Sequence, residues 1–341
     1  MSKIDFSKVS SSHSKLPDRV NNDQGEARKV GVEIEMSGIE LSMIVTQCNI
    51  VFGGQIREIS PYEFIIDHSE IGKIKVELDF RYLKKLEQEK FSGQLDHLQF
   101  SEIEHFASDA LAALSKNIIP CEVIAPPLPI YRLDKLKPLI DALRKHGAKG
   151  TRHSVLYANG VHLNPELPNL KTKTVLNYLR AFLCLQDWLI ETEKVSITRK
   201  LSPFIDKFSG DYVRLVLNLD YQPEQDQLID DYLRFNPSRN RALDMLPLFA
   251  YLDTERVKKT TGNQKLNIRP TLHYRLPNSD IDNPQWGIHQ CWNHWLQVES
   301  LAHDTDRLSQ VCEAYRLNHE LFSKEILIPW KDKVQEWLVV L

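Results

Sequence analysis

The sequence has no long hydrophobic run. No window of the 341 residues approaches the roughly 18 to 20 uninterrupted apolar residues that a membrane-spanning helix needs. The first residues, MSKIDFSKVSSSHSK, also lack the apolar core of a signal peptide. We therefore expect the protein to stay in the cytoplasm.

Paired cysteines and an excess of one charge are also missing. The five cysteines are odd in number, widely separated and never arranged as C-x-x-C, which argues against a disulfide framework and a cysteine-rich zinc site. With 43 Lys and Arg against 46 Asp and Glu, the formal charge is only -3. We therefore expect free thiols in a reducing compartment, and no general attraction to nucleic acid or to a membrane.

Three common motifs of nucleotide-binding proteins and hydrolases are absent as well. The chain contains no G-x-x-x-x-G-K-[ST], no G-x-G-x-x-G and no G-x-S-x-G, so P-loop, Rossmann and α/β-hydrolase interpretations lack their fingerprints. The composition that remains is ordinary for a globular protein, with 42% hydrophobic and 26% charged residues. The length suffices for one large domain or two ordinary ones.

The spacing of the apolar residues predicts an α+β protein. Residues 1–27, rich in Ser, Asn, Asp and Lys, are predicted to be a mobile leader before a domain that spans 28–341. Early strands and late helices, including a helical part at 284–341, favour an antiparallel sheet over βαβ alternation. Strands are expected at 29–36, 49–53, 63–66, 73–80, 121–130 (stopped by Pro126 and Pro127), 153–164 (a strand pair or one irregular strand) and 271–276. Helices are expected at 101–116, 132–146 (capped by Gly147), 172–195, 284–303, 305–323 and 327–340, with a loop-rich stretch between 195 and 271.

Glu33 and Glu35 form the sharpest local signal. Positions i and i+2 on a strand point to the same face, which sets these carboxylates roughly 6 to 7 Å apart. A divalent cation relieves their repulsion, and Mg²⁺ prefers such oxygen ligands. The same pattern fits two solvated acids on an exposed face, so the spacing alone leaves both interpretations open.

A second acidic pair, Glu77 and Asp79, repeats this spacing. Lys73, Lys75 and Arg81 share its parity and could neutralise the two acids on a solvated sheet edge. The alternation therefore favours a structural role for this pair over a metal site.

Single polar residues in apolar strands provide further candidates. Asp67 ends YEFIID and Glu122 lies in CEVIAPPL, and an acid there must be paired, hydrogen-bonded, metal-bound or solvated. His162 and Asn164 would project together from one face of NGVHLN, after Gly160. A functional and a purely structural role both fit this histidine.

Basic candidates follow later in the chain. Arginine suits phosphate through its rigid donor fork, although each of these residues also fits a surface ion pair. The candidates are Arg239, Arg241, Arg269 and Arg275.

The segment HQCWNHW invites a zinc interpretation, which its geometry argues against. On the predicted helix, His289 and His294 would lie about 140° apart, and no second cluster completes a tetrahedral set. Trp286, Trp292 and Trp295 instead predict that this helix is a packed core element.

An ordered series of motifs carries a family resemblance. In chain order, VGVEIEM, FIIDHS, CEVIAPPL, NGVHLN, SRNRALDMLPLF and TLHYR resemble the amidoligase family, which belongs to the glutamine synthetase and glutamate-cysteine ligase superfamily of carboxylate-amine ligases. The resemblance covers residues 28–303. It implies a curved antiparallel sheet of glutamine synthetase-like type, with ATP and metals on the concave face and helices behind.

The resemblance implies roles for the acids and the histidine. Glu33 and Glu35 would match the metal-binding E-x-E strand. Asp67 and Glu122 would be further acidic ligands around the Mg²⁺-ATP phosphates. His162 would match the family histidine near the phosphates or a metal.

The later motifs match less completely. Arg275 would match the arginine that meets the transferring phosphoryl group, while Arg239 and Asn164 are expected nucleotide contacts. The superfamily's last motif usually reads E-x-R, but here His273 replaces the glutamate, and imidazole is a poorer Mg²⁺ ligand than carboxylate. Residues 73–116 intervene where the family has a shorter link, so we interpret them as an insertion.

These features predict an ATP-dependent carbon-nitrogen ligase, with ATP and Mg²⁺ as its cofactors. It would join a small-molecule or peptide carboxylate to an amine through an acyl phosphate. The replacement at His273 motivates an alternative, a catalytically degenerate module of the same fold that binds a nucleotide or peptide. A third interpretation is an α+β scaffold whose acids are solvated. Nothing in the sequence indicates an oligomeric state.

Overall fold

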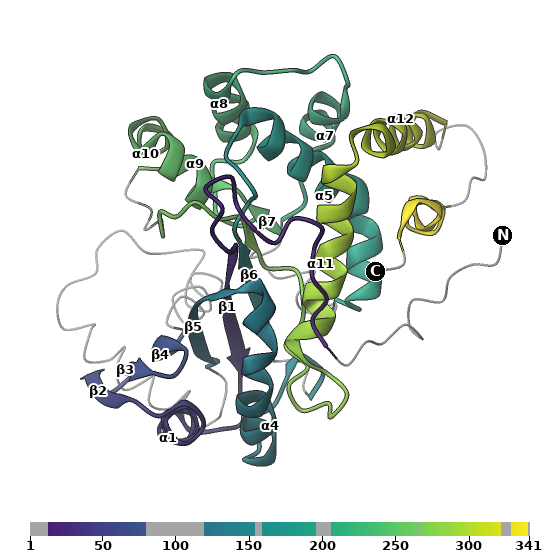
Figure 1. Ribbon diagram of the computed structural model, residues 1–341. Helices are drawn as coiled ribbons and strands as arrows, with labels where there is room; N and C mark the ends of the chain where they lie inside the picture. Colours follow the sequence, from purple (N-terminus) through teal and green to yellow (C-terminus); the bar gives the residue numbers. More distant parts are fainter. Residues whose placement is uncertain are drawn as a thin grey trace, which may run out of the picture.

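The computed structural model describes residues 13–79, 119–153, 159–195, 206–262, 264, 266–321 and 329–339 (Figure 1). Its strands are β1 Lys29–Met36, β2 Gln55–Ser60, β3 Glu63–Ser69, β4 Gly72–Leu78, β5 Cys121–Pro129, β6 Val161–Pro165, β7 Leu243–Asp244 and β8 His273–Tyr274. Its α-helices are α1 Leu41–Phe52, α4 Lys137–Lys145, α5 Thr172–Thr192, α7 Gly210–Leu217, α8 Gln225–Phe235, α9 Leu246–Leu252, α10 Thr254–Thr261, α11 Ile288–His303, α12 Thr305–Leu321 and α13 Trp330–Lys333. Short 3-10 helices are η2 Ile130–Leu136, η3 Thr151–His153 and η4 Val334–Trp337.

The described strands form one open sheet. Their order is β2-β3-β4-β5-β1-β6-β8-β7, and neighbouring strands pair antiparallel. The prediction of an α+β fold with an antiparallel sheet, supporting helices and a helical C-terminal part is therefore confirmed. The strand that carries Glu33 and Glu35, β1, lies inside the sheet between β5 and β6.

Alternation along β1 gives the sheet two different faces. Val30, Val32 and Ile34 on one side are at most 1% exposed and belong to the hydrophobic core. Glu33 and Glu35 point to the other side, because successive side chains on a strand alternate between faces. The apolar face holds the sheet to the core, and the opposite face carries the two acids.

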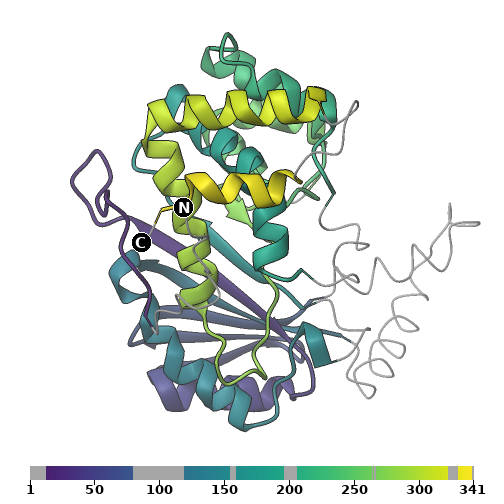
Figure 2. The same cartoon turned by 90° about the vertical axis from the view of Figure 1, so that its right-hand side faces the viewer.

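Helices are distributed at both ends of the molecule. Helix α1 packs against β3, β4 and α4, while η2 contacts β1 and β5. Figures 1 and 2 show α1 and α4 at the end of the molecule that holds the sheet, with α7, α8 and α12 at the other end. Helix α5 packs against α11, α12 and α7, so it organises the helical end.

A buried ion pair ties the first strand to the helical part. Arg28, immediately before β1, donates hydrogen bonds of 2.9 and 2.7 Å to the two carboxylate oxygens of Glu299 on α11. The two side chains are 0% and 1% exposed, and Trp295 donates to the same carboxylate. Removing either partner would leave a buried charge uncompensated, which is strongly destabilising.

The segment before β1 also contacts α11. Within the 1–27 segment, the structure describes residues 13–27, and Trp292 Nε1 donates a 2.8 Å hydrogen bond to the backbone oxygen of Lys15. The Lys15 N–H in turn donates to Asn293 Oδ1 at 2.9 Å. These hydrogen bonds place residue 15 beside the first half of α11.

One strand prediction in the first half of the chain is wrong. Residues 49–53 form the end of helix α1 rather than a strand. Ile44, Cys48 and Phe52 recur every four residues and are buried, as one face of a helix requires. Gly53 ends this helix with φ of 66°, in the left-handed region that glycine adopts readily.

The prolines of the fifth strand do not end it, contrary to prediction. Val32 pairs with Ala125 and Val30 pairs with Leu128, so Pro126–Pro127 together occupy the place opposite a single β1 residue. This irregularity lets β5 pass two residues that lack an N–H donor and then resume pairing.

The predicted helices at 172–195, 284–303 and 305–323 correspond to α5, α11 and α12, but the stretch between α5 and α11 differs from its prediction. The predicted 132–146 helix is divided between η2 and α4, and Gly147 follows with φ of 95° as expected. The stretch predicted to be loop-rich instead contains α7, α8, α9 and α10, so that prediction is wrong. The 101–116 helix lies outside the described residues, as does most of the predicted insertion at 73–116, of which β4 is the described part.

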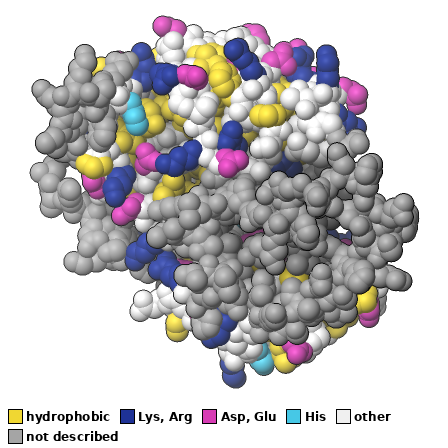
Figure 3. Space-filling model, turned by 180° about the vertical axis from the view of Figure 1, so that it is seen from behind, with side chains coloured by type: hydrophobic (Ala, Val, Ile, Leu, Met, Phe, Trp, Pro, Cys, Tyr) yellow, Lys and Arg dark blue, Asp and Glu magenta, His cyan; other side chains and the backbone are white. Residues whose placement is uncertain are grey.

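The described part of one face carries both signs of charge. On the face drawn in Figure 3, described Lys and Arg side chains are interspersed with Asp and Glu side chains. None of the described helices combines the length and hydrophobicity required to cross a bilayer.

Candidate functional site

The register of the three central strands brings the predicted acids and histidine together. On β1, Glu33 lies opposite His162 of β6, and Glu35 lies opposite Glu122 of β5. Directly opposed residues point to the same face of a sheet. Side chains from three strands, which the sequence could not identify as neighbours, therefore share one face.

Glu33 is held by hydrogen bonds from β6. It is 6% exposed, and it accepts hydrogen bonds of 2.9 Å from His162 Nδ1 and of 2.9 Å from Asn164 Nδ2. Burial acts to raise the pKa of Glu33, but the hydrogen bond from His162 and the nearby basic groups, Arg269 among them, more than offset it and hold this pKa well below its ordinary value. Glu33 is therefore an ionised carboxylate.

Ionised Glu33 assigns the tautomer of His162. A carboxylate only accepts hydrogen bonds, so the Nδ1 atom that contacts Glu33 must carry a proton. In the neutral imidazole the lone pair then lies on Nε2, which is 3.6 Å from Glu35 Oε1. A carboxylate that orients a histidine in this way is typical of metal sites.

Glu35 and Glu122 complete the first of two potential cation sites. Glu35 Oε2 accepts a 2.5 Å hydrogen bond from the Gly160 N–H, while Glu122 Oε1 lies 4.0 Å from His162 Nδ1. One donor atom from each of Glu35, Glu122 and His162 lies within 4.8 Å of the others, and all three residues are buried. Two carboxylates and one imidazole form a donor set that suits a divalent cation.

His273 joins a second group of this kind. The residue comes from β8, is 1% exposed, and its ring lies 5.1 Å from that of His162. Glu33, His162 and His273 each offer a donor atom within 4.8 Å of the others. Burial, followed by the charge of Arg275, lowers the pKa of His273 well below its ordinary value, so this histidine is neutral.

Arg269 reaches into this second group. Its Nη2 atom lies 2.6 Å from Asn164 Oδ1, 2.8 Å from His273 Nδ1 and 3.4 Å from Glu33 Oε1. The sequence placed Arg269 only among several basic candidates, because the strand order that brings residue 269 beside β1 cannot be read from local patterns. Its position four residues before His273 was the one available signal.

Arg239 and Arg275 meet on a buried aspartate beside the cluster. Asp244 is 0% exposed and lies opposite His273, and its Oδ2 is 3.6 Å from both Arg275 Nη2 and Arg239 Nε. Burial raises the pKa of Asp244 despite these two positive charges. Sequence reasoning missed Asp244, although an acid inside the apolar run ALDMLPLF was a usable signal.

Asp67 lies apart from the cluster. It is on β3, which β4 separates from β5, and its Oδ2 accepts a hydrogen bond of 3.0 Å from Arg57 Nη2. Lys73 Nζ lies 3.9 Å from its other oxygen. The structure does not bring this predicted ligand to the other acids.

Glu77 of the second acidic pair is neutralised by Lys75, one of the cations that its alternation indicated. Lys75 Nζ lies 2.8 Å from Glu77 Oε2 and 3.2 Å from Glu63 Oε1, with each of these side chains one quarter to one third exposed. Asp79 is buried just beyond the end of β4. Arg81 lies outside the described residues.

The tryptophans of HQCWNHW are part of the core, as predicted. Trp292 and Trp295 are 0% exposed, and Cys291 is also buried. His294 Nδ1 contacts Glu193 Oε1 at 2.9 Å. The segment therefore packs α11 against its neighbours.

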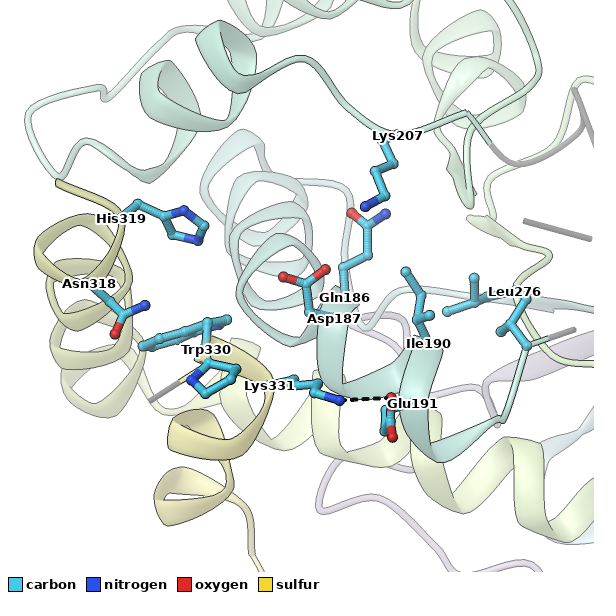
Figure 4. A pocket seen from close by; sticks show the side chains of 12 residues that line it. Gln186, Asp187, Ile190, Glu191, Lys207, Leu276, Asn318, His319, Trp330 and Lys331 are labelled. Atoms are coloured by element: carbon cyan, nitrogen blue, oxygen red, sulfur yellow. Dashed lines mark hydrogen bonds and ion pairs between the residues drawn. The ribbon is translucent and has the colours of Figure 1, made fainter. Parts of the chain in front are cut away.

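A separate cavity lies among the helices (Figure 4). It has a volume of about 500 Å³, and side chains of α5 and α12 line it together with Lys207, Leu276 and Trp330. Lys331 at its rim forms a 3.1 Å ion pair with Glu191. None of the acids or histidines of the sheet face lines this cavity, so it is distinct from the candidate site.

Fold and site together define a class of protein. The chain is an α+β protein whose antiparallel sheet carries a buried cluster of acids and histidines that could hold a metal ion, with arginines alongside. The model of a family described as putative amidoligase enzyme matches residues 26–297, and the chain belongs to this family. No curated protein and no solved structure matches the chain significantly.

Proposed function

We propose that this protein is an ATP-dependent carboxylate-amine ligase that forms an amide or peptide-like bond. The observation that carries the proposal is the buried group of Glu35, Glu122 and His162 inside the segment matched by the amidoligase family. Buried acids on adjacent strands repel each other unless a cation lies between them. The substrates would be a small-molecule or peptide carboxylate, an amine and ATP.

The reaction would proceed in two displacements. In the first, a carboxylate oxygen of the substrate bonds to the γ-phosphorus of ATP, the bond from that phosphorus to the β,γ-bridging oxygen breaks, and ADP leaves. In the second, the amine nitrogen attacks the resulting acyl phosphate, inorganic phosphate departs, and the nitrogen loses a proton. The overall products are an amide, ADP and phosphate.

The residues of the cluster would bind and orient the reactants. Glu35, Glu122 and His162 fit a divalent cation such as Mg²⁺, which when bound neutralises phosphate charge and polarises phosphate oxygens. Glu33 holds the His162 ring through its Nδ1 proton. Asn164 and Arg269 fix the other oxygen of Glu33.

The arginines would stabilise negative charge on the phosphoryl group in transit. Arg275 and Arg239 both approach Asp244 at 3.6 Å, so two guanidinium groups lie within reach of one another at one end of the cluster. Phosphoryl transfer is catalysed mainly by positioning and by such electrostatic stabilisation.

ADP release in the presence of Mg²⁺, across a panel of amino acids and amines, tests this function. We expect the Glu35→Gln variant to lose on the order of 100-fold or more of the amine-dependent rate, because a metal ligand supplies several kcal/mol of transition-state stabilisation. The matched control is Glu77→Gln, which removes a carboxylate from the same sheet face but from an ion pair with Lys75. Equal rates for wild type and Glu35→Gln would contradict the assignment.

A second candidate function follows from His273. It stands where the superfamily's last motif has a glutamate, and a neutral imidazole cannot supply the same negative charge to a metal. A degenerate module would bind ATP with Mg²⁺ without turnover. Calorimetric binding of ATP-Mg²⁺, combined with no ADP release in any substrate mixture, would favour this alternative.

A further inference from the structure

Arg269 occupies a position with the contacts of a bound cation. Its Nη2 atom is surrounded by Asn164 Oδ1, His273 Nδ1 and Glu33 Oε1 at 2.6, 2.8 and 3.4 Å, and these acceptors come from β6, β8 and β1. Three acceptors that converge on one positively charged nitrogen resemble the donor set of a metal ion. The Arg269 side chain is only 25% exposed, which strengthens these electrostatic contacts.

The acceptors around Arg269 overlap with the second potential cation site. Glu33 and His273 belong both to that site and to the contacts of Arg269. The guanidinium donates a proton to His273 Nδ1, so that lone pair is already used. A second cation there would have to displace the guanidinium or tolerate its repulsion.

His162 cannot serve both sites at once. Its Nδ1 proton is donated to Glu33, which leaves only the Nε2 lone pair for a metal. That atom is 3.6 Å from Glu35 Oε1. The histidine therefore belongs to the Glu35 and Glu122 site, and the second site keeps Arg269.

We propose that Arg269 takes the place of a second metal ion, so that the cluster binds one divalent cation, held by Glu35, Glu122 and His162. This inference rests on the proposed function for the presence of a metal, but it concerns the number of ions and the residue that replaces one of them. The site would thus combine one divalent ion with one fixed monovalent cation supplied by the chain.

Binding of Mn²⁺ to the full-length protein, measured by calorimetry and by electron paramagnetic resonance of the bound ion, tests the proposal. We expect one Mn²⁺ per wild-type chain. The Arg269→Ala variant should bind two, with dipolar broadening of the spectrum from the neighbouring ions, and Arg269→Lys should bind one. The matched control is Arg214→Ala, which removes an exposed arginine of α7 and should leave the stoichiometry at one.

Two outcomes would overturn the proposal. The first is that the wild-type chain binds either two Mn²⁺ ions or none. The second is that a folded Arg269→Ala variant still binds only one Mn²⁺ ion. Because wild-type stoichiometry is informative by itself, the proposal stays testable even if Arg269→Ala does not fold.

Two further variants distinguish the ligands from the neighbouring acid. Glu35→Gln should abolish Mn²⁺ binding, because it removes a ligand. Glu33→Gln should weaken binding by about 10- to 100-fold, as expected for a residue that orients a metal-bound histidine. If Glu33→Gln lost Mn²⁺ binding completely while Glu35→Gln kept it, the assignment of Glu35 as the metal ligand and Glu33 as the residue that orients His162 would be overturned.

Failure of the inference and failure of the proposed function are separable. Amine-dependent ADP release together with two Mn²⁺ per wild-type chain would preserve the ligase and reject the role of Arg269. One Mn²⁺ in wild type and two in Arg269→Ala, without any ADP release, would preserve the role of Arg269 and reject the ligase.

Discussion

Four glutamates form a row across four strands of the sheet, and its two halves behave differently. The register places Glu63 opposite Glu77, Glu77 opposite Glu122, and Glu122 opposite Glu35. In the outer half, on β3 and β4, Lys75 bridges Glu63 and Glu77, and the side chains are partly exposed. In the inner half, on β5 and β1, Glu122 and Glu35 are 1% and 9% exposed and lie beside His162.

The comparison shows that residue type and parity do not decide the role of an acid. Identical side chains on one face form partly exposed ion pairs on β3 and β4 and a potential metal site on β5 and β1. Burial and the identity of the neighbour make the difference, because water screens exposed charges and leaves buried ones strongly interacting.

The largest expected effect is a loss of stability when the buried ion pair between Arg28 and Glu299, next to the central strand β1, is broken. Arg28→Met leaves Glu299 buried without its counter-charge, and we expect a loss of about 3–5 kcal/mol in the free energy of unfolding. Lys75→Met removes the partly exposed pair on β4 and should cost less than about 1 kcal/mol. Denaturant unfolding of both variants measures the difference, and equal losses would contradict the contrast between buried and exposed pairs.

A smaller effect is expected from metal binding. At 100 times the dissociation constant, Mn²⁺ should raise the free energy of unfolding of the wild type by about 2.7 kcal/mol, because it binds only the folded state. Glu122→Gln should lose this stabilisation and Glu77→Gln should keep it, although the two residues face each other across β4 and β5. Thermal unfolding of both variants with and without Mn²⁺ measures this stabilisation. If Glu77→Gln also lost it, the inner and outer halves of the glutamate row would not differ in metal binding.

The smallest effect concerns acid pH. The pKa of Glu33 is lower in the folded than in the unfolded chain, so its contribution to stability is fully present above the ordinary value near 4.5 and is lost as the pH falls below it. The difference in unfolding free energy between wild type and Glu33→Gln should therefore shrink from pH 7 towards pH 3. Glu63→Gln, on β3 and partly exposed, provides the control, and a difference that stays constant with pH would argue against the assigned ionisation.

Much of the site was predictable because it depends on alternation within single strands. Two-residue periodicity placed Glu33 and Glu35 on one face and Val32 and Ile34 on the other. Glu122 stood out as an acid within an apolar strand. These are local properties, and they require no knowledge of which strands are neighbours.

The other residues of the site could not be placed from the sequence, because their neighbours in the fold are distant in the chain. Arg269 reaches Glu33 only because β8 lies next to β6, and Asp244 reaches His273 only because β7 pairs with β8. The strand error at 49–53 has a different cause. Its β-branched residues suggest a strand locally, but the burial of Ile44 against the sheet favours a helix.

The ion pair between Arg28 and Glu299 also has a consequence for synthesis on the ribosome. The two residues are separated by 271 positions, so at about 5–20 residues per second the carboxylate emerges roughly 15 to 55 seconds after the arginine. During this interval the central strand exists without the counter-charge that completes its burial. The first strand of the sheet to be translated is therefore among the last to reach its final environment.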